Sequence, residues 1–107
     1  MPRAILTNRR PAITFEFEHS FDPASKRPLT FLASVGCYAS GDIGEVFLNS
    51  TKLSSESDAY ARDAAIAISF ALQHGATVSE MKRAMTRNSD GNPSSPIGKL
   101  LDLLEEL

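Results

Sequence analysis

Apolar and polar residues alternate along the first half of the chain with the period of half-buried β-strands. In the stretch AITFEFEHS every second residue is apolar or aromatic, which predicts a first strand with one face turned inward. The stretch LTFLASVGCYA predicts a second strand from Phe31 to Tyr38, with a bulge at Gly36. The tight turn SGDIG leads into EVFLN, a third strand. The first half therefore predicts an antiparallel meander of about three strands.

The second half changes to helical spacing, and its first predicted helix runs from Ser57 to His74. Ser55 and Asp58 form a capping pair at its start, and Gly75 supplies the left-handed residue that closes many helices. Its polar side chains reduce mainly to one narrow stripe: Arg62, Ser69 and Gln73, with Asp63 beside them. Because so little of the helix is polar, we expect it to be covered on most sides.

Two shorter helices follow. The stretch TVSEMKRAMTR begins with the capping pair Thr77 and Glu80 and predicts a helix that ends in a basic cluster. In the third helix Ser95 is expected to be the N-cap, because its hydroxyl can accept a free backbone N–H, and Pro96 fits the first helical position. Apolar residues then recur at helical spacing toward the end of the chain: Ile97, Leu100, Leu101 and Leu104.

These elements predict one two-layer α+β domain over residues 1–107, with about three antiparallel strands followed by three helices and with residues 1–12 as a flexible N-terminal arm. The first helix is apolar on most of its circumference, and the last helix carries more leucines than one core-facing stripe requires: Leu100, Leu101, Leu103, Leu104 and Leu107. Three strands can cover only part of this surface. We therefore expect a two-fold homodimer.

Composition narrows the class of protein. The net charge of −2 gives no general attraction to nucleic acid or to acidic lipid. The first twelve residues lack the apolar core of a signal peptide, and the longest nearly apolar stretch, Ala64 to Leu72, is too short to span a bilayer. We expect a cytoplasmic protein without membrane contact. Cys37 is the only cysteine, which excludes an internal disulfide and a cysteine-based zinc site, and its strand position predicts burial.

Five charged residues are candidates for binding. Arg62 and Asp63 lie in an otherwise apolar helix, where they can bind a ligand or phosphate, although structural ion pairs are the favoured interpretation. Lys82, Arg83 and Arg87 can contact phosphates, together with Arg9 and Arg10, but a solvated helix end is favoured over that function.

The remaining candidates for chemistry are weak. His19 and His74 could join Asp22 or Asp63 in a metal site, but a histidine near a helix C-terminus is more simply explained by its contact with the helix dipole. No Gly-rich phosphate loop or dinucleotide motif is present in the sequence. The sequence predicts no catalytic residue, no cofactor and no bound metal.

The order of motifs adds a resemblance. The segments RPAITFEFE, ASVGCYASGDIGEVFLN, DAYARDAAIAISFALQHGATVSEMKRAM and GNPSSPIG together resemble the TSCPD domain, found at the C-terminal end of adenosylcobalamin-dependent ribonucleotide reductases and as a free-standing small protein. GDIGEVFLN and ALQHG are the strongest parts. Where the family has its name-giving Thr-Ser-Cys-Pro-Asp run, this chain has PSSPI, residues 93–97, so cysteine and aspartate are both missing. The resemblance covers only an appendage of the reductase and therefore does not imply reductase activity.

Three functions remain open at this point. The leading hypothesis is a non-catalytic protein-binding or regulatory module whose partner, from the resemblance, is a ribonucleotide reductase or another enzyme of nucleotide metabolism. The first alternative is a nucleic-acid or nucleotide-binding accessory protein that uses the basic cluster from Lys82 to Arg87. The second alternative is a small enzyme of unknown type.

Overall fold

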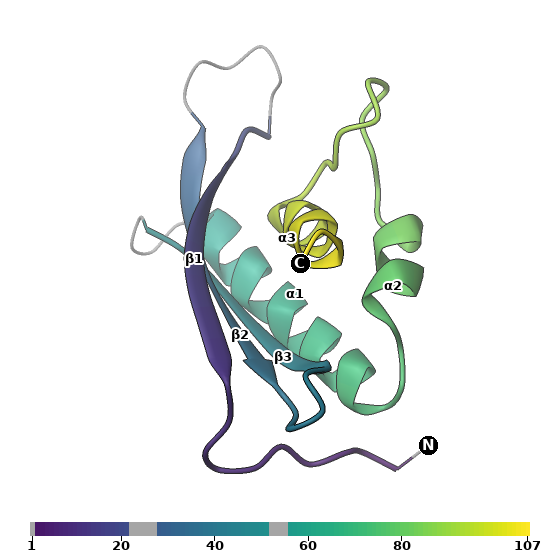
Figure 1. The fold of residues 1–107 in the computed structure, drawn as a ribbon. Helices are drawn as coiled ribbons and strands as arrows, with labels where there is room; N and C mark the ends of the chain where they lie inside the picture. The colour runs from purple at the N-terminus through teal and green to yellow at the C-terminus, as the bar shows by residue number, and fades with distance from the viewer. Residues whose placement is uncertain (1, 22–27, 52–55) are drawn as a thin grey trace.

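The fold is a three-stranded sheet with helices on one side of it (Figure 1). The computed structural model describes residues 2–21, 28–51 and 56–107. Its elements, in chain order, are β1 (Ala12–His19), β2 (Leu29–Cys37), β3 (Ile43–Ser50), α1 (Glu56–Gln73), α2 (Val78–Ala84) and α3 (Pro96–Glu105). The strands form one antiparallel sheet in the order β1-β2-β3. The predicted α+β fold, with three antiparallel strands followed by three helices, is confirmed.

The pairing of the strands explains their alternating pattern. Phe17 lies opposite Phe31, and Val35 lies opposite Val46, so aromatic and β-branched side chains form the inner face of the sheet. The predicted bulge is confirmed, because the register shifts between Gly36 and Cys37. The predicted bounds of two strands were wrong: β2 runs from Leu29 to Cys37 rather than from Phe31 to Tyr38, and β3 extends beyond EVFLN at both ends, from Ile43 to Ser50. The Tyr38 N–H donates to the Asp42 carbonyl at 2.8 Å, so its backbone belongs to the turn.

The core lies between the inner face of the sheet, α1 and α3. Its largest fully buried side chains are Phe31, Leu48, Leu100, Leu101, Val35 and Val46. Leu104 is also buried, and Leu103 packs partly buried against the core. Of the leucines from which we expected a dimer, only Leu107 is largely exposed. The sheet, α1 and α2 therefore cover most of α3 within a single chain.

Helix α1 covers the outer edge of β3 with polar side chains. The Ser69 hydroxyl accepts the Val46 N–H at 2.8 Å and donates to the Val46 carbonyl at 2.9 Å. Gln73 Nε2 donates to the Gly44 carbonyl at 3.0 Å. Two of the three residues of the predicted polar stripe therefore bind the sheet, and an edge that would be open to another strand is closed.

The bounds and coverage of α1 differ from the prediction. The helix begins at Glu56 and ends at Gln73, and Gly75, with φ of 104°, follows as predicted. The proposed cap Ser55 lies outside the described residues. The expectation that the helix is covered on most sides was wrong for the single chain, because Ile66 and Phe70 are 51% and 48% exposed. One side of α1 turns away from both the sheet and α3.

The two shorter helices begin as predicted. The Thr77 side chain accepts the Glu80 N–H at 3.1 Å, and the Ser95 hydroxyl accepts the Gly98 N–H at 3.1 Å, which confirms both as N-caps. Pro96 occupies the first turn of α3. Helix α2 is shorter than predicted and ends at Ala84, so Arg87 lies beyond it, in a loop where it bridges to Pro93.

The N-terminal arm runs from β1 to the C-terminal end of α1. The Ala4 N–H donates to the Gln73 carbonyl at 2.8 Å, and the Tyr38 hydroxyl donates to the Ala4 carbonyl at 2.8 Å. Arg10 pairs with Glu45, whose side chain is largely buried. The arm therefore makes specific contacts that the sequence did not indicate, while its flexibility stays a prediction.

Candidate functional site

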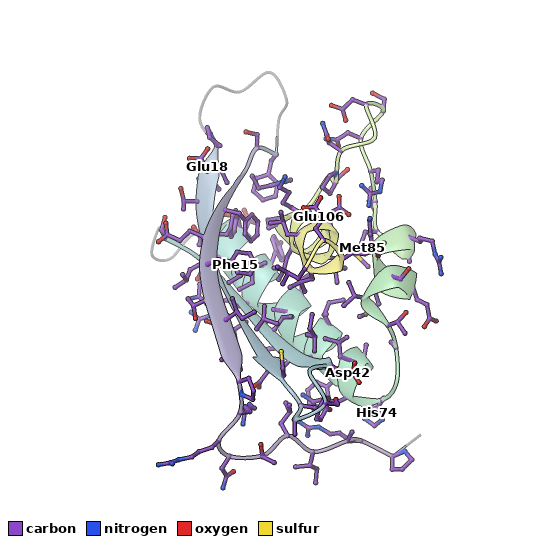
Figure 2. The ribbon with its side chains drawn as sticks, in the orientation of Figure 1. Phe15, Glu18, Asp42, His74, Met85 and Glu106 are labelled. Carbon is purple, nitrogen blue, oxygen red and sulfur yellow. The ribbon has the colours of Figure 1, made fainter. Side chains whose placement is uncertain are left out.

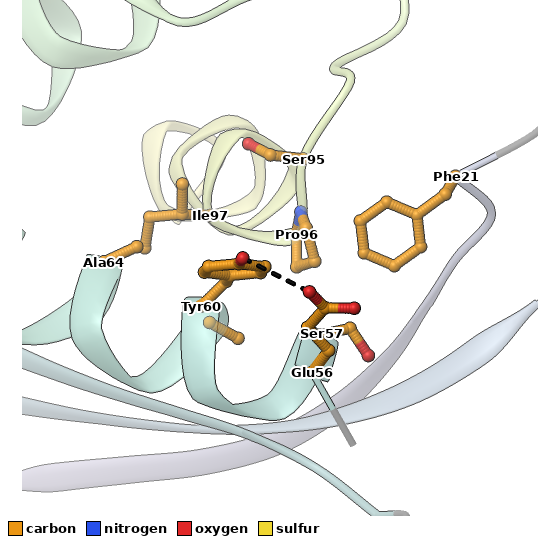
Figure 3. Close-up of a pocket in the computed structure, with 9 residues that line it drawn as sticks. Phe21, Glu56, Ser57, Tyr60, Ala64, Ser95, Pro96 and Ile97 are labelled. Carbon is orange, nitrogen blue, oxygen red and sulfur yellow. Dashed lines mark hydrogen bonds between the residues drawn. The ribbon is translucent and has the colours of Figure 1, made fainter.

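The first candidate site is an apolar hollow where the first turns of α1 and α3 meet. Its volume is about 440 Å³, and three segments that are distant in the sequence line it: Tyr60, Ala61 and Ala64 of α1, Pro96 and Ile97 of α3, and Phe21 after β1. Figure 3 shows the rings of Tyr60 and Phe21 on either side of Pro96. Tyr60 is 69% exposed, so the hollow opens to solvent.

Polar groups lie only at the margin of this hollow. The Tyr60 hydroxyl donates to a Glu56 carboxylate oxygen at 3.4 Å, one helical turn away (Figure 3). The Ser95 hydroxyl is engaged as the N-cap of α3. A hollow of this kind can take an apolar side chain, with one carboxylate available at its edge.

A second hollow, of about 400 Å³, is polar and lies between the end of β1, the loop before α3, and α3 itself. His19 is buried there, with Nε2 3.3 Å from the Ser94 carbonyl oxygen. Burial lowers the pKa of His19, the hydrogen bond to Ser94 opposes that effect, and the positive charge of Lys99 lowers the pKa further. Glu18 and Asp90 line the same hollow. Burial therefore favours the neutral form of His19, and its contact with Ser94 joins β1 to the loop before α3.

The five charged residues singled out from the sequence do not line one cleft. Arg62 lies on the exposed side of α1, with its guanidinium 3.6 Å from the Asp58 carboxylate, and Asp63 is exposed beside it. Neither residue lines the apolar hollow between α1 and α3 or the polar hollow beside His19. Their proposed role in binding stays a prediction.

The basic cluster is largely engaged by α3. Arg87 donates to both carboxylate oxygens of Asp102, at 2.7 and 3.1 Å, and Lys82 lies 3.5 Å from Glu105. The hydrogen bonds with Arg87 lower the pKa of Asp102, and the same bonds raise the pKa of Arg87. Arg83 is exposed on α2. Two of the three cations thus fasten α2 and its following loop to α3.

The residues considered for metal binding lie apart. Figure 2 places Glu18, the neighbour of His19, and His74 at opposite ends of the molecule. Asp22 lies outside the described residues. In the described part of the chain no group of three or more His, Cys, Asp or Glu side chains lies close enough together to hold a metal ion. Cys37 is a free, partly buried thiol at the end of β2.

No helix in the described ranges combines the length and apolarity needed to cross a membrane.

The sequence indicated neither of the two hollows. It singled out Ser69 and Gln73, but not their binding to the edge of β3. The polar stripe on α1 was visible as helical spacing, but periodicity does not say what a stripe contacts. The apolar hollow combines Phe21, Tyr60 and Pro96, which are separated by dozens of residues and share no pattern. Only the fold brings them together.

The chain matches no protein-family model, no curated protein and no solved structure. The resemblance to the TSCPD domain therefore stays a prediction drawn from the motifs themselves.

Proposed function

We propose that this chain is a non-catalytic protein-binding or regulatory module that receives an apolar side chain of a partner in the hollow between α1 and α3. The observation that supports this function is the hollow itself: about 440 Å³, apolar, open to solvent and bordered by exposed aromatic rings. Exposed aromatic side chains around an apolar pocket are typical of interfaces where one anchoring side chain carries much of the binding energy.

The chemistry of the hollow defines the partner segment. Phe21, Tyr60 and Pro96 favour an aliphatic or aromatic anchor, and the Glu56 carboxylate at the margin favours a basic residue close to that anchor. The TSCPD resemblance implies that the partner is a ribonucleotide reductase or another enzyme of nucleotide metabolism. On this proposal the module acts in the cytoplasm, where the composition predicts it to be.

The basic cluster gives less support to nucleic-acid binding. Lys82 and Arg87 already lie against carboxylates of α3, so a phosphate would have to displace those contacts or bind mainly through Arg83. An enzymatic function is supported less still, because the sequence predicts no catalytic residue and the apolar hollow is lined mainly by apolar side chains.

The test is selection from a random library of displayed twelve-residue peptides on the immobilised full chain. We expect the selected peptides to share an aliphatic or aromatic anchor with a lysine or arginine nearby. Binding of a synthetic selected peptide is then measured by fluorescence anisotropy against Ala64→Phe, in which the new ring fills the hollow. This variant should abolish binding.

Ala67→Phe is the matched control. It adds the same ring at an exposed position of α1 that does not line the hollow, so it should bind the peptide like the unchanged protein. Peptides that bind both variants equally would place the binding surface elsewhere, and a library without any enriched sequence would contradict a peptide-binding function.

A further inference from the structure

The strand β1 forms one margin of the sheet, and its backbone polarity is fixed by its pairing with β2. The Cys37 N–H donates to the Pro11 carbonyl at 2.9 Å, while the Thr30 carbonyl turns the other way and accepts the Thr51 N–H at 3.0 Å. Because these directions alternate along a strand, the odd-numbered residues of β2 bond to β1 and the even-numbered ones bond to β3. Each odd-numbered residue of β1 lies opposite an odd-numbered residue of β2, so the odd-numbered residues of β1 bond to β2. The backbone groups of the even-numbered residues, Ala12, Thr14, Glu16 and Glu18, therefore face away from the sheet.

This outer edge of β1 is open. Within the described residues no hydrogen bond reaches the backbone N–H or C=O groups of these four residues, and all four are exposed. Figure 1 shows β1 at the margin of the molecule, while α1 lies along β3. The two margins of the sheet therefore differ, because Ser69 and Gln73 bind the backbone at the β3 edge. An open eight-residue edge is a template for pairing with one more strand.

We propose that β1 pairs in antiparallel orientation with β1 of a second copy, with the two-fold axis at Phe15. Thr14 then exchanges two backbone hydrogen bonds with the partner's Glu16, and the same pair occurs again across the axis. Phe15 lies opposite the partner's Phe15, and Ile13 lies opposite the partner's Phe17. The two sheets join into one continuous sheet of six strands.

The side chains of β1 favour a second copy in this register. On the inner side, Ile13 is 47% exposed and Phe15 is partly buried, and pairing gives both of them apolar neighbours. On the outer side of the sheet, the Glu16 side chain of each copy lies opposite the partner's Thr14, so no like charges face each other there. A shift of the axis to Glu16 would instead place two like charges directly opposite each other, which is unfavourable.

The asymmetry between the two margins limits the assembly to two copies. Each copy offers one open edge, and the pairing consumes both of them. The edges that remain belong to β3, where α1 already bonds both backbone groups of Val46 and the carbonyl of Gly44. A closed two-fold dimer results, with no edge free for further growth. This inference is independent of the proposed function, because it does not use the hollow between α1 and α3.

Light scattering coupled to size exclusion, over a range of concentrations of the full chain, tests the proposal. We expect twice the mass of one chain. Thr14→Pro removes an outward N–H that the second copy needs, and proline is tolerated at strand edges of this kind, so this variant should have the mass of a single chain. Thr14→Ala is the matched control: both variants lose the 3.2 Å hydroxyl contact with Ser34, but alanine keeps the N–H and should remain dimeric.

Hydrogen exchange of the unchanged protein supplies a second readout if Thr14→Pro does not fold. The amides of Thr14 and Glu16 should exchange more than about tenfold more slowly at high protein concentration than at low concentration. A single-chain mass at every concentration, or a dimer that persists in folded Thr14→Pro, would overturn the proposal. Protection of these amides only after another protein is added would assign the edge to a different partner, and it would also overturn the proposal.

Discussion

The hydroxyl of Ser69 on α1 accepts the N–H of Val46 and donates to its carbonyl, so one side chain satisfies both backbone groups of an edge residue of the sheet. These backbone groups would otherwise be cut off from water by the helix that covers them. The contact therefore fixes the position of α1 along β3 and closes that edge of the sheet.

Ser69→Ala should lower the free energy of unfolding by about 1–3 kcal/mol, because it leaves the N–H and the carbonyl of Val46 without partners. Urea denaturation monitored by circular dichroism measures the change. Ser89→Ala is the control, since it makes the same chemical change at an exposed loop position and should stay within about 0.5 kcal/mol of the unchanged protein. Equal effects of the two substitutions would mean that the Ser69 contact does not stabilise the fold.

Ser95→Ala should cost about 1 kcal/mol of stability, because it removes the acceptor for the Gly98 N–H at the start of α3. Ser95→Asp should be tolerated, since its carboxylate can accept the same N–H at the positive end of the helix. The same denaturation experiment compares the two variants. The capping role would be wrong if the aspartate variant were as unstable as the alanine variant.

The side chain of Arg10 pairs with the largely buried carboxylate of Glu45. Arg10→Ala leaves that carboxylate without its cation and should lower stability by about 1–3 kcal/mol. Arg9→Ala removes an equal charge from an exposed position and should have little effect. Thermal melts of both variants give the comparison, and a silent Arg10→Ala would indicate that the arm does not hold this contact in solution.

Stability should fall as the pH is lowered below about 6.5, the ordinary pKa of histidine. Burial lowers the pKa of His19 in the folded protein, so at pH values between the lowered pKa and 6.5 the unfolded chain binds a proton that the folded chain does not. Folding is therefore favoured at higher pH, and the advantage is lost as the pH falls through this window. Urea denaturation at pH 7.5 and at pH 5.5, one value on each side of pH 6.5, measures this loss of stability.

His19→Gln should lose this part of the pH dependence, whereas His74→Gln, at the exposed end of α1, should keep it. The explanation fails if the dependence survives in His19→Gln, because another group would then be responsible.

The strands and the helix starts were predictable from the sequence because their signals are local. Alternation at Ile13 and Phe15 gives the strand period, and a serine before a proline gives the cap of α3. Helix α2 was predicted too long because apolar Met85 continues the helical spacing, although its backbone is already extended. The ends of elements depend on such single dihedral angles more than on periodicity.

The candidate sites were less predictable because they depend on contacts between distant segments. A salt bridge such as Arg87 with Asp102 requires that α3 pack beside the loop after α2, and no spacing in the sequence encodes that packing. The basic cluster therefore looked free in the sequence although two of its members are engaged. The open edge of β1 was hidden for the same reason, since it depends on which strand ends at the margin of the sheet.

The hydrogen bond between Ala4 and Gln73 has a practical consequence for labelling. It holds the start of the described chain beside the C-terminal end of α1 (Figure 1). The residues of α1 that line the apolar hollow, which include Glu56 and Tyr60, lie toward the other end of that helix. A fluorophore or an affinity handle attached ahead of Pro2 would therefore emerge about a helix length, roughly 27 Å for the 18 residues of α1, from the hollow. That position suits surface immobilisation, because the hollow would face the solution.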